Sequence, residues 1–111
     1  MDCIFCKIVS REIPSKIVHE TERLIVIEDI NPQAPTHLLL IPKTHYLTIL
    51  DCDDREVLAE LLDTARKIAR DVGVAKKGFR LVVNTNEEGG QEILHLHMHL
   101  LGGKVLSGRM G

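Results

Sequence analysis

A chain of 111 residues is the size of one ordinary domain, and we expect residues 1–111 to form a single one. Its 44% hydrophobic and 27% charged residues match a globular protein and exclude a disordered or fibrous class. The formal net charge of −2 comes from 14 basic and 16 acidic residues that are interspersed along the chain, so we expect no nucleic-acid partner.

The start of the chain, Met1-Asp2-Cys3, is acidic and polar where a signal peptide would be basic. The apolar runs at residues 24–27 and 38–41 are far too short to span a membrane. We therefore expect a cytoplasmic protein with no membrane partner. In that reducing compartment the Cys3-x-x-Cys6 pair favours metal or redox chemistry over a structural disulfide, whereas Cys52 is expected to be incidental.

The amino-terminal half predicts a short apolar turn and three strands. Residues 3–9 form the turn, which can be helical. Residues 17–19 and 24–28 are β-rich runs that suggest a hairpin. Two prolines make residues 31–35 a loop, and residues 37–41 then form a buried strand that the following proline stops.

The carboxy-terminal half predicts one long helix and two strands. Asp53 as N-cap and Glu56 three residues later form a capping box, and apolar residues follow at helical spacing until a glycine closes the helix. Residues 79–84 read as a strand, residues 86–90 as a tight turn and residues 94–101 as a final strand. The pattern is a meandering antiparallel five-stranded sheet with one long helix and a short amino-terminal helix, an α+β fold.

Three histidines alternate along the last predicted strand. Side chains of successive strand residues point to opposite faces, so His95, His97 and His99 would line one face. The opposite face would belong to the core and carry Leu94, Leu96, Met98 and Leu100. A polar stripe on a half-exposed strand is normally built from Thr, Lys or Glu. Three imidazoles within five residues therefore indicate a functional site.

Two chemistries compete for these histidines. A His-x-His pair with a further histidine is a ligand set for catalytic zinc. Alternatively, a neutral imidazole is a nucleophile, and a backbone carbonyl that accepts its other ring N–H would fix the tautomer. The preceding Gly89-Gly90-Gln91 favours the second chemistry, because glycines let backbone N–H groups converge on a phosphoryl group.

Three motifs combine in this chain: Gly89-Gly90-Gln91-x-x-x-His95-x-His97-x-His99-Leu100-Leu101, Asp29-Ile30-x-Pro32-Gln33-Ala34-Pro35-Thr36-His37 and Ile41-Pro42-Lys43-x-His45. Together they resemble the histidine-triad (HIT) superfamily. Within it, the chain is similar to the histidine-triad nucleotide-binding proteins, often called Hint or protein kinase C inhibitor-like. The resemblance covers essentially the whole chain.

The resemblance implies a homodimeric nucleoside phosphoramidase or related nucleotidyl hydrolase that acts on purine nucleotides. His97 would attack the α-phosphorus and form a nucleotidyl-histidine, which water then hydrolyses. His99 would contact the phosphoryl oxygens or the leaving-group atom, and Asn84 would help to hold the phosphate. The alternatives are a dinucleoside polyphosphate hydrolase of the same superfamily and a non-catalytic nucleotide-binding regulatory or scaffold protein.

The resemblance also implies the nucleotide contacts. Asp29 would accept hydrogen bonds from both ribose hydroxyls, which suits a carboxylate with two acceptor oxygens, although Asp also commonly forms turns. The backbone of Gly90, Gln91 and Glu92 would help to hold the phosphate. Five apolar side chains would enclose the base: Ile4, Phe5, Ile8, Ile27 and Ile30. For the isoleucines the alternative is simple core packing, which is equally expected for Ile8.

Two departures from the superfamily pattern concern the phosphate and the leaving group. Many relatives place a serine after Gly-Gly-Gln, whereas this chain has Glu92, so only its backbone N–H can bind phosphate directly. The tail, residues 102–111, lacks the tryptophan found in some relatives. Because that tail can influence substrate choice across a dimer, the leaving group stays open.

Some superfamily members bind zinc, and the resemblance implies the same four ligands here, Cys3, Cys6, His45 and His95. Two thiolates and two imidazoles form a closed tetrahedral set, the pattern of a structural zinc with no site left for water. The zinc would pin the amino-terminal turn to the catalytic strand. The alternative is a pair of reduced thiols in an apolar turn.

Overall fold

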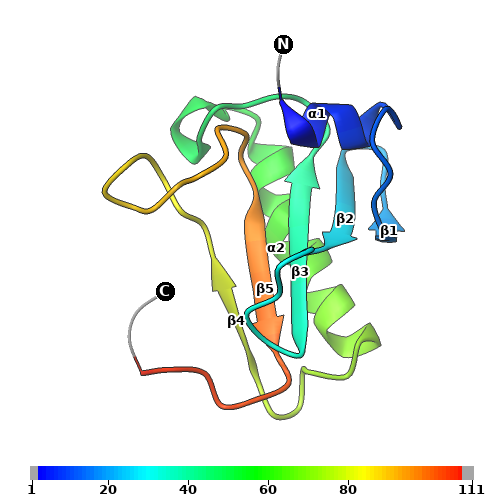
Figure 1. The fold of residues 1–111 in the computed structure, drawn as a ribbon, viewed down its shortest axis with the longest axis vertical. Coiled ribbons are helices and arrows are strands. Elements are labelled where there is room, and N and C mark those ends of the chain that lie inside the picture. Colours follow the sequence, from blue (N-terminus) through cyan, green and yellow to red (C-terminus); the bar gives the residue numbers. More distant parts are fainter. Residues whose placement is uncertain (1–2, 109–111) are drawn as a thin grey trace.

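The computed structural model describes residues 3–108 and contains one antiparallel sheet in the strand order β1-β2-β3-β5-β4 (Figure 1). The strands are β1 (Ile17–Glu20), β2 (Leu24–Glu28), β3 (Thr36–Pro42), β4 (Phe79–Val82) and β5 (Met98–Gly102). With the short helix α1 (Ile4–Val9), the turn η1 (Ile49–Asp51) and the long helix α2 (Arg55–Asp71), they confirm the α+β prediction. The first two residues and the last three of the tail lie outside the described residues.

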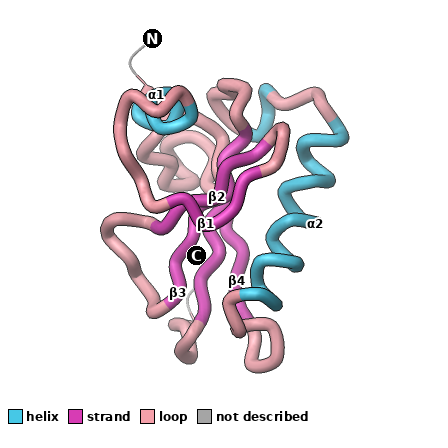
Figure 2. Tube along the Cα trace, turned by 90° about the vertical axis from the view of Figure 1, so that its right-hand side faces the viewer, coloured by secondary structure: helices cyan, strands magenta, loops and turns pink. Residues whose placement is uncertain are grey.

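The central strands have an apolar layer on each face. Figure 2 shows α2 along one face of the sheet and α1 on the other side, near one end. Leu24 and Val26 of β2 pack in the cluster on the α2 side, and Ile25 and Ile27 pack in the cluster on the α1 side. Because both faces of this strand are covered, it reads as a continuous apolar run.

The strand register sets the position of the histidines. In the pairing of β3 with β5, Leu39 lies opposite His99 and His37 lies opposite Leu101. In the pairing of β5 with β4, His99 lies opposite Val82. His99 is therefore in the middle of three adjacent strands. Because Met98 and Leu100 belong to the α2-side cluster, His99 points to the opposite face, where α1 lies.

The last strand is shorter than predicted. It begins at Met98, so the prediction that the strand starts at residue 94 was wrong, and His95 and His97 precede it. The backbone there bonds elsewhere: Leu96 N donates to Tyr46 O at 2.7 Å. Leu94, expected in the core, is 56% exposed, whereas Leu96 is buried as predicted.

Smaller differences concern the ends of elements and one cysteine. The long helix begins after Asp54, whose side chain accepts hydrogen bonds from the N–H groups of Glu56 and Val57, so Asp53 is not its N-cap. Strand β4 ends at Val82, two residues early, and β3 includes Pro42 as its last residue. Cys52 is 4% exposed and belongs to the α2-side core. Among the described residues, no helix is long and apolar enough to cross a membrane.

The identity of the helix cap gives a test of the start of α2. Asp54→Ala removes the acceptor for two helix N–H groups, so the free energy of unfolding should fall by about 1 kcal/mol. Asp53→Ala removes the same charge one residue earlier and should change it much less. Urea denaturation of both variants measures the difference, and equal losses would contradict the placement of the cap.

Candidate active site and metal centre

His97 is held as a neutral imidazole in which one ring nitrogen is a free acceptor. Its Nδ1–H donates to the carbonyl oxygen of His95 at 2.7 Å, so the lone pair is on Nε2. The ring is 8% exposed, and the ring of Phe5 meets it edge-on with centroids 5.0 Å apart. Burial lowers the pKa of His97, and the bond to the carbonyl only partly opposes this effect. Neutral charge, fixed tautomer and free nitrogen are the properties that a histidine nucleophile needs.

A chain of hydrogen bonds fixes the tautomer of His99. The backbone N–H of Gln33 donates to His37 Nδ1 at 3.0 Å, so neutral His37 carries its proton on Nε2. That Nε2 lies 2.9 Å from His99 Nδ1 and donates to it. His99 therefore carries its own proton on Nε2. Its second nitrogen is a hydrogen-bond donor, complementary to the acceptor nitrogen of His97.

The pKa values keep this chain neutral. Burial and, to a smaller extent, the neighbouring His97 and His37 together lower the pKa of His99 to about 4, and the Asp29 carboxylate opposes this only in part. Burial also lowers the pKa of His37. Near neutral pH both rings are therefore uncharged, and the direction of the hydrogen bonds is preserved.

His37 was missed as a functional side chain in the sequence, where it was given only as the start of a buried strand and the last residue of a family motif. The ring is buried and contacts His99 and Asp29. The signal was present in the sequence, because an imidazole heads an otherwise apolar run. What the sequence did not contain is the register that puts this run beside the last strand.

Asp29 lies at the turn between β2 and β3. Its Oδ1 accepts from the backbone N–H of Asn31 at 2.8 Å, which is the turn-forming role that competed with ribose binding. Its Oδ2 lies 3.4 Å from His37 Nε2. One carboxylate oxygen therefore shapes the turn, and the other points toward the histidines. The two roles are compatible.

The five side chains predicted to enclose a base fall into two groups. Phe5, Ile8 and Ile27 are buried together in the α1-side cluster. Ile4 is 43% exposed and Ile30 is 95% exposed. Of the buried three, Phe5 contacts the ring of His97. The exposed two have apolar surface that a flat ligand could cover. For Ile8 the structure supports the core-packing alternative.

The glycine-rich loop before the histidines is held by its own hydrogen bonds. A Cβ on Gly89 would collide with the backbone of Thr85, and Gly90 has a φ of 76°, so neither position suits another residue. The N–H groups of Gly90 and Gln91 donate to Glu87 O and Asn86 O, both at 3.0 Å.

The side chains of Asn84 and Gln91 also hold this loop in place through hydrogen bonds. Asn84 Nδ2 donates to Gly89 O at 2.7 Å. Gln91 Nε2 donates to Leu47 O at 2.8 Å and Ile93 O at 3.0 Å. Of the three predicted phosphate-binding amides, only that of Glu92 has no partner among the described residues. Of the three amides, that of Glu92 is therefore the one available to donate to a phosphate.

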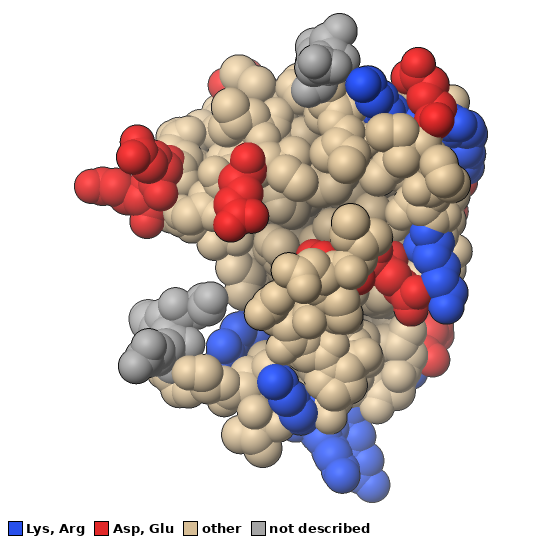
Figure 3. Space-filling view, in the orientation of Figure 1, with Lys and Arg blue, Asp and Glu red and all other residues tan. Residues whose placement is uncertain are grey.

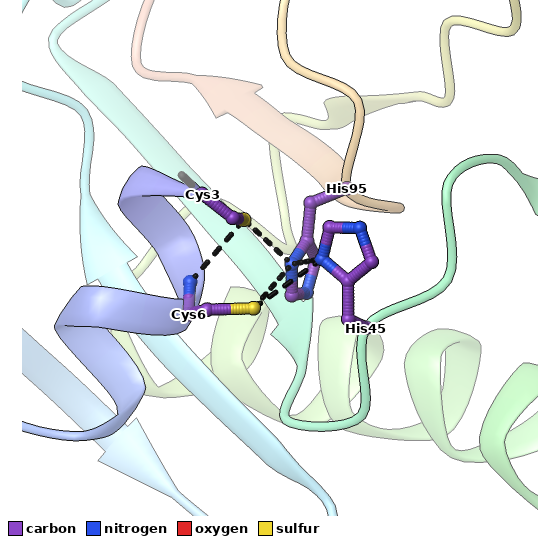
Figure 4. Close-up of side chains that lie close together, drawn as sticks. All are labelled: Cys3, Cys6, His45 and His95. Carbon is purple, nitrogen blue, oxygen red and sulfur yellow. Dashed lines mark hydrogen bonds between the residues drawn. The ribbon is translucent and has the colours of Figure 1, made fainter. Parts of the chain in front are cut away.

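Cys3, Cys6, His45 and His95 converge next to this site (Figure 4). Cys3 is the N-cap of α1 and His95 precedes β5, so the cluster joins the first helix to the last strand. Cys3 Sγ lies 3.2 Å from His95 Nδ1, and Cys6 Sγ lies 3.3 Å from His45 Nδ1. The two Nδ1 atoms are 3.0 Å apart.

The donor set fits a tetrahedral zinc ion. Zinc bond lengths of about 2.3 Å to sulfur and about 2.0 Å to nitrogen imply ligand–ligand separations of roughly 3.5 Å, close to those observed. His95 Nε2–H donates to Pro42 O at 2.8 Å, which turns the lone pair of Nδ1 toward the cysteines. Burial and the neighbouring Cys3 raise the pKa of the Cys6 thiol, so a thiolate there needs a cation beside it. These residues could hold a metal.

A second group with closely spaced ligand atoms consists of Asp29, His37 and His99. Its hydrogen bonds argue against a metal there, because Gln33 N–H occupies His37 Nδ1 and leaves the proton on the Nε2 that a metal would need. His97 belongs to neither group of described residues. The geometry therefore favours a nucleophilic histidine over a zinc ion held by the triad.

Comparisons with known proteins agree with this arrangement. A model of the HIT domain family matches residues 10–106. The purine nucleoside phosphoramidase of Escherichia coli (strain K12) is 47% identical over 107 residues, which cover 95% of this chain and 90% of that protein.

Solved structures show the same similarity. A HIT family hydrolase from Legionella pneumophila Philadelphia 1 has a TM-score of 0.94 and 48% identity, covering 99% of this chain and 100% of that one. A Zn-bound histidine triad family protein from Mycobacterium smegmatis has a TM-score of 0.85 and 31% identity, covering 100% of this chain and 84% of that one. This chain belongs to the HIT domain family.

Proposed function

We propose that this protein hydrolyses purine nucleoside 5′-phosphoramidates through a covalent nucleotidyl intermediate on His97. The observation that carries the proposal is the pair of complementary nitrogens, an acceptor on His97 and a donor on His99, each set by a hydrogen bond at the other ring nitrogen. The identity of 47% to a protein named purine nucleoside phosphoramidase supports the substrate class.

The reaction has two steps. In the first, a bond forms between His97 Nε2 and the α-phosphorus as the phosphorus–nitrogen bond breaks, and the departing amine takes one proton from solvent. In the second, water adds its oxygen to phosphorus, releases His97 and returns one proton to solvent. The carbonyl of His95 stabilises the positive charge on the imidazole of the intermediate.

The other residues bind and orient the substrate. His99 Nε2–H donates to a phosphoryl oxygen or to the departing nitrogen, and the Glu92 amide binds the phosphate from the loop side. Asn84 acts by holding the loop through Gly89 O. Asp29 Oδ2, which lies 3.4 Å from His37 Nε2, accepts from the ribose. The base lies over Phe5, between the exposed Ile4 and Ile30.

The metal has a structural role in this proposal. Cys3, Cys6, His45 and His95 would hold a zinc ion with protein ligands alone, and the ion would supply a cross-link and no catalytic chemistry. His95 then orients the backbone carbonyl that His97 uses. A homodimer remains a prediction from the family resemblance, and a cytoplasmic location remains a prediction from the start of the chain and its short apolar runs.

Turnover of two substrates distinguishes the proposed function from the two alternative functions. A dinucleoside polyphosphate hydrolase would prefer diadenosine polyphosphate to adenosine 5′-phosphoramidate. A regulatory or scaffold protein would bind AMP and turn over neither substrate. We expect adenosine 5′-phosphoramidate to be the better substrate.

Removing the nucleophile should abolish turnover without unfolding the protein. His97→Ala should lower kcat by at least about a thousandfold, because no other side chain supplies the attacking nitrogen. Rapid quenching of the wild type should trap the nucleotide on His97. His19→Ala, a histidine exposed on β1, is the matched control. Near-normal turnover by His97→Ala would rule out the mechanism.

Ribose recognition can be separated from the turn at Asp29. Asp29→Asn keeps an acceptor for Asn31 N–H but loses the carboxylate charge. The wild type should favour ribo- over 2′-deoxynucleotide substrates by about tenfold in kcat/KM, and the variant should lose most of this preference. Asp53→Asn should retain it. An unchanged ratio in Asp29→Asn would place the ribose contact elsewhere.

Metal content distinguishes structural zinc from catalytic zinc. Cys6→Ser should lower both bound zinc and Tm, while the folded fraction keeps its turnover. Cys52→Ser should retain zinc, because that thiol belongs to the core. His97→Ala should keep about one zinc per chain. Elemental analysis, thermal melts and turnover give the result. A zinc-free His97→Ala protein would favour catalytic zinc instead.

A further inference from the structure

The two cysteines of the metal cluster lie close enough to bond to each other. All four ligand atoms of the cluster are within 4.8 Å of one another, and this limit includes the two sulfurs. A disulfide bond is about 2.05 Å long, so the sulfurs need to approach by less than about 3 Å. The N–H of Cys6 donates to Cys3 Sγ at 3.4 Å, which directs the Cys3 side chain over the first turn of α1. The pair therefore suits a disulfide as well as a metal ion.

The sulfur and nitrogen ligands come from different parts of the chain. In Figure 4 the two cysteines lie at the first helix, and the two histidines lie on two other segments. Cys3 and Cys6 are three residues apart, whereas Cys3 and His95 are 92 residues apart. The sulfurs can therefore join within one turn of chain, while a metal ion joins that turn to the catalytic segment. Because a metal ligand must be a thiolate, a disulfide excludes the metal.

The two sulfurs differ in their access to solvent. Cys3 is 6% exposed, whereas Cys6 is only partly buried. In Figure 3 the charged side chains of the upper part, where α1 lies, are at its left and right sides, and the surface between them is uncharged. A small uncharged oxidant such as hydrogen peroxide therefore meets Cys6 first, and Cys3 lies behind it to complete a disulfide.

The third cysteine does not compete for this reaction. Cys52 is 4% exposed and packs in the α2-side cluster, whereas Cys3 packs in the α1-side cluster. The sheet lies between the two clusters. Oxidation is therefore confined to the Cys3-x-x-Cys6 pair, and Cys52 provides an internal reference.

We propose that Cys3 and Cys6 form a peroxide-reactive pair, and that its oxidation to a disulfide releases the metal ion and lowers the stability of the fold while kcat is retained. The inference rests on the proposed structural metal and not on the phosphoramidase reaction. It makes the thermal stability of the protein dependent on the redox state of its surroundings.

The chemistry balances with hydrogen peroxide as the oxidant. The Cys6 thiolate attacks one peroxide oxygen, so a sulfur–oxygen bond forms as the oxygen–oxygen bond breaks, which gives a sulfenic acid and a hydroxide ion. The Cys3 thiolate then attacks the Cys6 sulfur and displaces a second hydroxide ion. The two sulfurs lose two electrons to the peroxide. Both hydroxide ions take a proton from solvent and become water.

Oxidation exchanges a long-range cross-link for a local one. The metal ion would join His95 to Cys3, 92 residues away, and to His45, 50 residues away, whereas the disulfide closes only residues 3–6. Because loop-closure entropy grows with loop length, the local bond restricts the unfolded chain much less. The ring of His95 keeps its hydrogen bond to Pro42 O, so the carbonyl that His97 uses stays in place. Stability therefore falls while the nucleophile is retained.

Titration of the zinc-loaded full chain with hydrogen peroxide tests the inference. A chromogenic chelator measures released zinc, mass spectrometry of a proteolytic digest identifies the disulfide, and thermal melts give Tm. We expect about one zinc ion released for each Cys3–Cys6 disulfide and a fall in Tm of at least about 5 °C. The kcat for adenosine 5′-phosphoramidate, measured well below the lowered Tm, should be unchanged. Dithiothreitol with added zinc should restore the original Tm.

Two variants separate the roles of the cysteines. Cys52→Ser is the matched control and should release zinc and lose stability as the wild type does. Cys3→Ser lacks the second sulfur, so Cys6 should stop at the sulfenic acid, which dimedone labels. A dimedone label on Cys52 instead of Cys6 would contradict the assignment of the reactive pair.

The remaining outcomes each overturn the inference. Zinc that stays bound, an unchanged Tm, or a disulfide that joins two chains instead of Cys3 and Cys6 would do so. A chain that takes up no zinc has no cross-link to lose, and a kcat that falls in proportion to released zinc would favour catalytic zinc. None of these results contradicts the hydrolysis of phosphoramidates, which fails only if no phosphoramidate is turned over by the reduced, zinc-loaded protein.

Discussion

His95 forms hydrogen bonds in three directions, and the rest of the site depends on it. Its Nε2 donates to Pro42 O, its Nδ1 faces the two cysteines, and its carbonyl accepts from His97 Nδ1. The ring is completely buried. A rotation of this residue would change the metal cluster and the tautomer of the nucleophile together. The position of α1 and the chemistry of His97 are therefore linked through one side chain and its own backbone.

Burial has opposite consequences for the two kinds of side chain at this site. For His97 and His99 it lowers the pKa and keeps the rings neutral, as a nucleophile and a hydrogen-bond donor require. For Cys6 it raises the pKa and disfavours the thiolate that a metal ion would need. The same apolar surroundings thus favour the catalytic chemistry directly and make the cysteines dependent on a cation.

The fold and the histidine motif could be predicted from local pattern, whereas the metal ligands and the nucleotide contacts were implied by the family resemblance. The differences come from contacts between distant segments. Periodicity and turns identified the helices, the strands and the histidine motif. The sequence contains two adjacent candidates for the helix cap, Asp53 and Asp54, and pattern alone does not choose between them. The strand seemed to begin at residue 94 because alternation continues there, but the backbone bonds to the segment around Tyr46 instead.

Other features were missed because they need the register of the sheet. The hydrogen bond from His37 to His99 joins residues 62 positions apart. Arg80 looks like an ordinary surface charge in the sequence, and only the pairing of β4 with β5 places it opposite Leu101, two residues along the strand from His99. The match to the family model begins at residue 10, so it does not include the cysteine pair or Phe5.

The separation of the four cluster residues along the chain has a consequence for the order of events in folding. Cys3 and His95 are 92 residues apart, and His45 lies 50 residues before His95. Bringing such distant segments together costs loop-closure entropy and belongs late in folding. During synthesis the cluster cannot be completed until residue 95 has emerged, and His97 follows two residues later. A chain that binds metal there would acquire its cross-link and its nucleophile in the same final stage, so an incomplete chain would have neither.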